Sequence, residues 1–321
     1  MNSGGSELIK VLKAELLKLD YKTDKQYSQV LEEVSYILEE TILEEIKWQN
    51  IKALEHPHPR SRIYRSEPES WTIKDSHAQS IYKLIKEKAA HSKKTVACIF
   101  DLDGTLFDVG YRTLGILNEW AESFQAKKFD KKLVNRVKNV DYHHLGYSLI
   151  HAFENAGFDL RNQYSLDMIN NIESFWKRRF FDGETLLNYD GVIKGGPDFI
   201  QRLRKELNIE IFYLTGRYEH RMREGTEKQL LENRILFNKK NLILKDNPSQ
   251  EDHIYKAFQV KKISESYDVL ANFENEYANL NFMAQHIPEA LHVIVDSHHS
   301  GRYVDKMKES VYRITDFQSY V

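Results

Sequence analysis

A second cysteine, a long apolar run and an excess of charge of either sign are all missing from this chain of 321 residues. The single cysteine, Cys98, excludes an intramolecular disulfide, and its apolar neighbours predict a buried core residue in a reducing, cytoplasmic compartment. No segment approaches the roughly 20 apolar residues of a membrane span, and the acidic residues near the N-terminus argue against a signal peptide. Because the net charge is only −2, we expect neither nucleic acid nor a membrane as partner.

Short apolar segments that alternate with helical patterns make up most of the chain after residue 94. The alternation predicts an α/β fold with a doubly wound, Rossmann-like parallel sheet. A helix is expected near residues 76–90, and another begins near Pro197. The expected strands are TVACIF (95–100), IEIFYLTGR (209–217), NLILK (241–245), YDVLANFENE (267–276) and ALHVIVDSHH (290–299).

Two helical regions fall outside this alternation. Residues 110–188 interrupt it and predict a separate helical cap, which leaves 95–109 and 189–321 as the core. Residues 1–94 predict an N-terminal helical extension with an apolar stripe over about 27–54. The stripe must be buried, either on the core of the same chain or in a homodimer or partner interface. No sequence feature separates these alternatives.

In the stretch VACIFDLDGTLFD, an apolar strand is followed directly by two carboxylates, Asp101 and Asp103. Residues two positions apart in an extended segment point the same way. Two buried like charges are costly, so a cation is expected beside them. Thr215 follows a second strand, and Glu274 and Asn275 follow a third. Because the carboxyl ends of parallel strands meet at one edge, these residues are expected to converge there.

Four motifs in this order resemble the haloacid dehalogenase-like phosphohydrolase superfamily with a helical cap inserted after the first motif. DLDGT resembles its first motif, YLTGR its second, and FENEYAN its acidic fourth, while the third is a lysine before the fourth. Lys256 lies on the helix at the usual place, and Lys245, at the end of a strand, is the alternative. The resemblance covers residues 95–321 and leaves 1–94 uncovered.

The resemblance implies that Asp101 is a nucleophile that forms an aspartyl-phosphate. It implies that Asp103 protonates the leaving oxygen and then deprotonates water. Dehalogenases of the superfamily lack this second acid, so Asp103 favours phosphoryl transfer. Thr215 and Gly216 are expected to bind the phosphoryl group, and Lys256 to offset its charge. Arg217 either reaches the substrate or forms a surface salt bridge.

Magnesium is the cofactor that the resemblance implies. Its expected ligands are Asp101, the backbone carbonyl of Asp103 and an acid of the fourth motif. The superfamily usually has two aspartates there, whereas this chain has Glu274 followed by Asn275, which still offer oxygen ligands. Glu276 is expected to be solvated rather than bound to metal.

The function predicted is a magnesium-dependent, cytoplasmic phosphatase of a small phosphorylated metabolite. A cap of about 80 residues would keep a large protein from Asp101. A phosphotransferase or mutase of the same superfamily and a non-catalytic phosphate-binding protein remain alternatives, and a phosphatase of nucleic-acid ends has little support from the charge. Five further residues are considered and expected mostly to pack or lie at the surface: His143, His144 and Arg178 in the cap, and the loop residues His56 and His58.

Overall fold

The computed structural model describes Pro68, residues 71–300, Arg302, Val304, Met307 and residues 310–318. The apolar stripe expected over 27–54 and the two loop histidines His56 and His58 lie outside these residues. Within them, no helix combines the length and apolar character that a membrane crossing requires.

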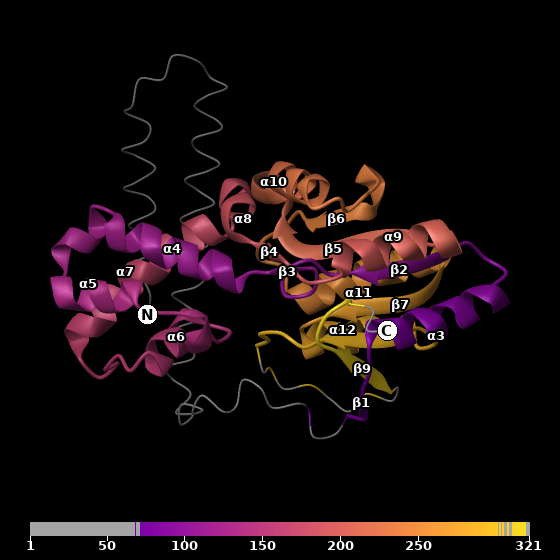
Figure 1. The fold of residues 1–321 in the computed structure, drawn as a ribbon, viewed down its shortest axis with the longest axis horizontal. Coiled ribbons are helices and arrows are strands. Elements are labelled where there is room, and N and C mark those ends of the chain that lie inside the picture. The colour runs from indigo at the N-terminus through magenta and orange to yellow at the C-terminus, as the bar shows by residue number, and fades with distance from the viewer. Residues whose placement is uncertain are drawn as a thin grey trace, which may run out of the picture. The chain divides into compact units, whose positions relative to one another are not determined.

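A parallel sheet organises the described part of the chain, with strand order β1-β9-β8-β7-β2-β5-β6 (Figure 1). The doubly wound α/β fold predicted from the sequence is confirmed, and each of the five expected strands is present. Two strands at one edge of the sheet, β1 and β9, were not predicted. The strands of the sheet are β1 (Ile73–Asp75), β2 (Val96–Phe100), β5 (Glu210–Tyr218), β6 (Leu242–Lys245), β7 (Asp268–Glu274), β8 (Leu291–Val295) and β9 (Val311–Ile314).

Helices cover both faces of the sheet, which is why β2 is an almost uninterrupted apolar run. Side chains of α3, α9 and α10 pack on one face, and those of α11 and α12 on the other (Figure 1). These helices are α3 (Ala78–His91), α9 (Gly196–Leu207), α10 (Glu219–Glu232), α11 (Asp252–Ser266) and α12 (Tyr277–Ala284).

An aromatic cluster fixes the two central strands that lead into the site. The rings of Phe100 on β2 and Phe273 on β7 stack at 4.3 Å, and Phe199 of α9 meets Phe273 edge-on at 5.7 Å. All three are buried. Burying such a side chain contributes about 1.5–3 kcal/mol relative to exposure. The residues that directly follow the stacked pair, Asp101 and Glu274, are therefore held on a rigid part of the sheet.

A helical cap with its own apolar core is inserted between two very short strands. The strands β3 (Phe107–Asp108) and β4 (Gly191–Val192) pair antiparallel and form the junction with the core, a ribbon that the sequence did not predict (Figure 1). Trp120 lies at the centre of the cap core, where its indole N–H donates to Asn171 Oδ1 at 2.8 Å. The cap helices are α4 (Gly110–Glu122), α5 (Lys131–Lys138), α6 (Leu149–Asn155), α7 (Gln163–Phe180) and α8 (Gly183–Tyr189).

Two elements belong to the sheet and its cover although they lie before residue 95, the predicted start of the core. Strand β1 pairs with β9, and Ile81 and Ile85 of α3 are fully buried in the main apolar cluster. The predicted limits of the N-terminal extension (1–94), the cap (110–188) and the core (95–109 and 189–321) stay predictions.

Candidate active site

The carboxyl ends of β2, β5 and β7 carry the residues predicted from the motifs. Phe100 of β2 is in register with Phe273 of β7, and β5 pairs with β2 on its other side. Asp101 follows Phe100, Glu274 follows Phe273, and Thr215 is the sixth of the nine residues of β5. The sheet thus brings three loops to one edge, as open α/β sheets do at their binding crevices.

Lys256 of α11 lies between two buried carboxylates. Its Nζ donates to Asp101 Oδ1 at 2.7 Å and to Glu274 Oε2 at 2.7 Å. Burial and the charge of Glu274 outweigh the effect of Lys256 and raise the pKa of Asp101 to about 7. Burial also raises the pKa of Glu274, against the opposing charge of Lys256. Burial would lower the pKa of Lys256, but the two carboxylates raise it, so the ammonium group stays charged.

The alternative lysine, Lys245 at the end of β6, is directed to another acid. Its Nζ donates to Asp252 Oδ1 at 2.6 Å and to the Gln250 carbonyl at 3.1 Å. The Asp252 carboxylate lies 2.9 Å from the position that a Cβ of Gly216 would occupy. Gly216 therefore allows this close approach, and Lys256 is the lysine that the fold places beside Asp101.

Asp103 is bound by two arginines. Arg217 donates to Asp103 Oδ1 through Nη2 at 2.6 Å and Nε at 3.0 Å, and Arg112 of α4 donates to the same oxygen at 2.9 Å. Both arginines are fully buried, so Arg217 does not form the surface salt bridge that was one of its two expected roles. Burial alone would raise the pKa of Asp103, but the charges of Arg112 and Arg217 hold it well below its usual range.

The arginine pair extends into a network that sequence reasoning missed. Arg112 Nε donates to Asp190 Oδ1 at 2.7 Å, and Gln229 Nε2 donates to Asp190 Oδ2 at 2.9 Å. Arg217 Nη1 donates to Gln229 Oε1 at 2.8 Å. Arg112, Asp190 and Gln229 are far apart in the chain and match no motif. The only sequence signal is that the two segments joining cap and core each carry a charged residue, Arg112 and Asp190.

A tight turn brings the first and fourth motifs together. Gly104 has a φ of +80°, which strains other residues, and a Cβ there would lie 2.3 Å from Asn275 Nδ2. Asn275 Nδ2 donates to the His298 carbonyl at 2.8 Å. Thr105 ties the turn back by a long 3.5 Å hydrogen bond to Asp101 Oδ2. Glycine at 104 is thus required both by the backbone and by the packing of Asn275.

Glu276 is not solvated as expected. Its carboxylate accepts hydrogen bonds from the backbone N–H of Ser300 at 2.7 Å and the Ser300 hydroxyl at 2.6 Å. The backbone N–H of Glu276 in turn donates to Glu274 Oε1 at 3.1 Å. Glu276 therefore fastens the loop after β8 beside the fourth motif, which explains why it is partly buried without being directed at Asp101.

Thr215 is buried, and its hydroxyl accepts the backbone N–H of Arg217 at 3.3 Å. This bond is local, as the hydroxyl of a strand-end threonine often makes, and it orients Oγ1 within the turn that carries Arg217. The structure thus brings Thr215 to the edge that holds Asp101, at the start of the segment that binds Asp103.

Tyrosines rather than the candidate histidines connect the cap to the core. Tyr142 donates from its hydroxyl to Asp108 Oδ2 at 2.7 Å. Tyr147 is 46 % exposed, but partial desolvation of its hydroxyl and the negative charge of Glu276 raise its pKa. His144 Nδ1 instead lies 2.8 Å from Asp141 within the cap. His143 and Arg178 are exposed.

Oxygen donors at this edge fit a magnesium ion better than a softer metal. The donors are the carboxylates of Asp101 and Glu274, the Asp103 carbonyl and the side-chain amide oxygen of Asn275. Magnesium is bound by few protein oxygens and keeps waters for the rest of its shell. Within the part of the chain that the structure describes, no three or more His, Cys, Asp or Glu side chains gather as a metal-binding group. A closed, all-protein metal cage is thus not formed by these residues.

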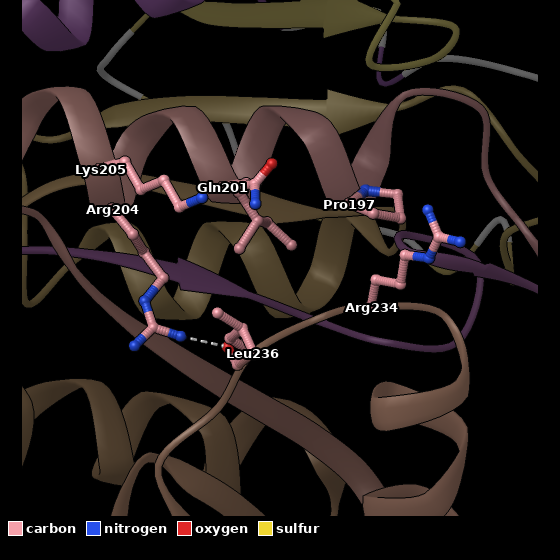
Figure 2. A pocket seen from close by; sticks show the side chains of 7 residues that line it. Pro197, Gln201, Arg204, Lys205, Arg234 and Leu236 are labelled. Carbon is pink, nitrogen blue, oxygen red and sulfur yellow. Dashed lines mark hydrogen bonds between the residues drawn. The ribbon is translucent and has the colours of Figure 1, made fainter.

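A separate surface pocket of about 220 Å³ lies between α9 and the loop after α10 (Figure 2). Arg204, Lys205 and Arg234 line it, and Arg204 donates to the Leu236 carbonyl at 2.5 Å. None of its lining residues belongs to the clusters around Asp101 and Asp103.

Comparison with known proteins gives one family and a set of similar folds. Residues 178–314 match the family model described as HAD superfamily, subfamily IIIB (acid phosphatase). The matched segment contains Thr215, Lys256 and Glu274 and begins after the DLDGT motif. No curated protein sequence matches the chain.

Several solved structures are similar to the chain at low sequence identity. A class C acid phosphatase from Bacillus anthracis is 13 % identical, with a TM-score of 0.34 over 70 % of this chain and 74 % of that one. A hydrolase from Pseudomonas syringae is 16 % identical, with a TM-score of 0.36 over 70 % and 94 %. CbbY from Rhodobacter sphaeroides is 16 % identical, with a TM-score of 0.37 over 69 % and 94 %.

The family match falls on the strands and helices that carry the second, third and fourth motifs, and the first motif lies beside them at the end of β2. Lys256 joins the first motif to the fourth through Asp101 and Glu274. The resemblance drawn from the sequence is therefore confirmed for residues 178–314, which match a family model of the haloacid dehalogenase superfamily.

Proposed function

We propose that this protein hydrolyses the monoester of a small phosphorylated metabolite, with magnesium, through a phosphoryl group carried on Asp101. The observation that supports the proposal best is the state of Asp101. It is a buried carboxylate that follows a central strand directly, and Lys256 holds its Oδ1 at 2.7 Å. A rigid, desolvated carboxylate beside a fixed cation suits attack on phosphorus better than a structural ion pair.

The two aspartates divide the proposed chemistry. Asp101 Oδ2, the oxygen that Lys256 does not hold, attacks phosphorus while the bond from phosphorus to the ester oxygen breaks. Asp103, which the two arginines keep ionised, passes a proton from the bound phosphate monoester to that leaving oxygen. Water then attacks the phosphorus of phosphoryl-Asp101 and passes its proton to Asp103, which returns it to the departing inorganic phosphate, so both carboxylates end in their starting states.

Charge supports the proposed metal. Asp101 and Glu274 have one lysine between them, so this cluster keeps an excess negative charge that a phosphate would increase. Asp101, Glu274, Asn275 and the Asp103 carbonyl would hold the ion, which screens the repulsion between nucleophile and phosphate when bound. Lys256 would keep Asp101 Oδ1 in place.

The cap supports a small substrate. Tyr142 bonds Asp108 beside the first motif, and Tyr147 lies near Glu276 of the fourth. A cap segment next to both motifs restricts the space for the leaving group and helps to exclude water. We therefore expect phosphorylated metabolites, rather than phosphoproteins, to be the substrates.

A phosphatase screen tests this proposal. The purified full-length protein is incubated with a panel of phosphorylated metabolites and with a phosphopeptide, with magnesium or with EDTA, and free phosphate is measured. Release from one or more metabolites that needs magnesium supports the proposal. No release from any compound, with the protein folded and magnesium present, would contradict it. Transfer of phosphate to an added alcohol without release would indicate a phosphotransferase.

A further inference from the structure

The outward face of α11 is apolar in the middle and charged at both ends. The side of this helix that packs on the sheet is buried and includes Lys256 and Val260. On the other side, exposed residues recur at spacings of three and four, beginning just before the helix: Glu251, Ile254, Phe258, Lys261 and Glu265. Such spacings place these five side chains in one line along the helix, which we call the α11 line.

The apolar part of the α11 line continues onto the neighbouring helix. Ile254 is 50 % exposed and Phe258 51 % exposed, and the Lys262 ammonium lies 4.4 Å from the centre of the Phe258 ring. Phe282 of α12 is 37 % exposed, and its ring packs at 4.4 Å against that of His253, the residue before Ile254. Single exposed apolar side chains need no explanation, whereas a group of neighbours marks an interaction surface.

The charges on the α11 line complement those of a second copy of the same helix. When two copies are placed antiparallel about a point level with Lys256, Ile254 meets Phe258 of the second copy. In the same register, Glu251 meets Lys261 of the second copy. A two-fold axis produces each of these pairs twice. Two apolar contacts are thus flanked by two pairs of opposite charge, whereas parallel pairing would place each charge against its own kind.

We propose that this protein forms a homodimer in which the α11 helices of two copies pack antiparallel around Ile254 and Phe258. The contact covers about three turns of each helix, with the axes about 8–10 Å apart. Specific interfaces typically bury about 800 Å² on each partner, and this one lies at the small end, so we expect a reversible dimer with micromolar affinity. An anionic membrane surface fits less well, because it would repel Glu251 and Glu265.

Charge reversal tests the antiparallel register directly. Glu251→Lys leaves only lysines at the two charged positions that pair, and Lys261→Glu leaves only glutamates. Each variant alone should therefore dimerise about 10-fold more weakly than wild type or worse. An equal mixture of the two variants should form a heterodimer about as tight as the wild-type dimer, because every lysine then meets a glutamate of the other copy.

The measurement is the dissociation constant from sedimentation velocity of the full-length protein, from low to high micromolar concentration. One of the two charge variants carries a fluorescent label in the mixing experiment, so that the heterodimer is observed by itself. Residues 251 and 261 are ten positions apart on one helix, too far to pair within a single copy. Rescue by mixing therefore reports contact between copies.

An apolar substitution with a matched control locates the interface. Phe258→Ser removes the largest apolar side chain of the α11 line and should weaken the dimer about 100-fold, since buried aromatic anchors carry much of the binding energy. Phe124→Ser is the control, because Phe124 lies in the cap, is 75 % exposed and does not belong to the line. It should leave the dissociation constant unchanged. Circular dichroism and thermal unfolding establish that each variant is folded.

Three results would overturn the proposal. A wild-type protein that stays monomeric at every concentration has no such interface. A dimer that Phe258→Ser does not weaken uses another surface, such as the stripe predicted over 27–54. A dimer that Phe258→Ser weakens but that the mixed charge variants do not restore lacks the antiparallel register. None of these measurements depends on the proposed phosphatase function.

Discussion

Two aspartates one residue apart meet opposite environments in this protein. Asp101 shares a single lysine with Glu274, and all three groups come from the core. Asp103 is bound by two arginines, one from the core and one from the cap. Burial and Glu274 raise the pKa of Asp101 to about 7, whereas Arg112 and Arg217 hold the pKa of Asp103 far below its usual range, against the effect of burial.

The difference indicates where a cation is needed. Around Asp103 the chain supplies as many positive as negative groups, counting Asp190, so the cluster is balanced without any ligand. Around Asp101 there is one cation for two carboxylates, which favours a divalent ion or a proton there. The environment, rather than the residue type, thus distinguishes the two aspartates: it supports the proposed metal beside Asp101 and keeps Asp103 ionised.

The largest effect is expected from removing the charge of Asp101, because the contrast between the two aspartates depends on it. Asp101→Asn keeps the size of the side chain but abolishes the nucleophile, so phosphate release should fall at least ~10⁴-fold. The measurement is phosphate release from the substrate found by the screen, with Asp167→Asn, an exposed cap carboxylate, as control. Near-wild-type turnover by a purified Asp101→Asn protein would show that another group attacks phosphorus.

The second test concerns the cation that Asp101 shares. Lys256→Met leaves Asp101 and Glu274 buried without their common partner, so kcat should fall about 10³-fold, and the free energy of unfolding by about 3–5 kcal/mol. Lys245→Met, which breaks the contacts with Asp252 and the Gln250 carbonyl but none with Asp101, should change kcat less than about 3-fold. If Lys245→Met were the more damaging of the two, the lysine beside Asp101 would not be the one that serves the reaction.

The third test concerns the metal. Glu274→Gln removes a charged oxygen from the Asp101 cluster and should raise the magnesium concentration for half-maximal activity about 10²-fold. Glu276→Gln alters only the contact with Ser300 and should raise it less than about 3-fold. Titration of magnesium into EDTA-treated protein measures both. An equal shift, or a larger one for Glu276→Gln, would move the metal ligand away from Glu274.

Much of the site could be predicted because its signals are local. An apolar run that ends in a polar residue marks a strand and its loop, and parallel pairing then brings Asp101, Thr215 and Glu274 to one edge. The helix before the fourth motif likewise placed Lys256, and the structure brings it to Asp101. These inferences need only short stretches of sequence and the rule that parallel strands share a carboxyl edge.

The unpredicted features depend on contacts between distant segments. Strands β1 and β9 are short, partly exposed and recognisable mainly by their pairing with each other and with β8. The β3–β4 ribbon has two residues in each strand. Arg112 and Asp190 are 78 positions apart. Neither the burial of Arg217 nor the hydrogen bond that Ser300 donates to Glu276 produces a periodic pattern in the sequence. A single sequence cannot reveal such pairs.

The smallest effect is expected at His292, a buried ionisable group that differs from Asp101 and Asp103 because it is not paired with a charge of opposite sign. His292 of β8 is fully buried and shares a 2.7 Å hydrogen bond with Asn272 of β7. Burial lowers its pKa from 6.5 to about 4, and Lys88 adds to the shift. The folded state therefore binds fewer protons than the unfolded state below pH 6.5, so stability present at neutral pH is lost as pH falls toward 4.

At pH 5 this loss should be about 2 kcal/mol relative to pH 7, because the unfolded histidine is protonated and the folded one is still mostly neutral. His292→Gln cannot titrate, so its free energy of unfolding should fall by about 2 kcal/mol less than that of wild type over the same interval. Urea unfolding at pH 7, 6 and 5 measures this, with the exposed His286→Gln as control. Parallel curves for wild type and His292→Gln would show that His292 takes up its proton over the same pH range in the folded and unfolded protein, in which case burial without a counter-charge does not suppress its ionisation.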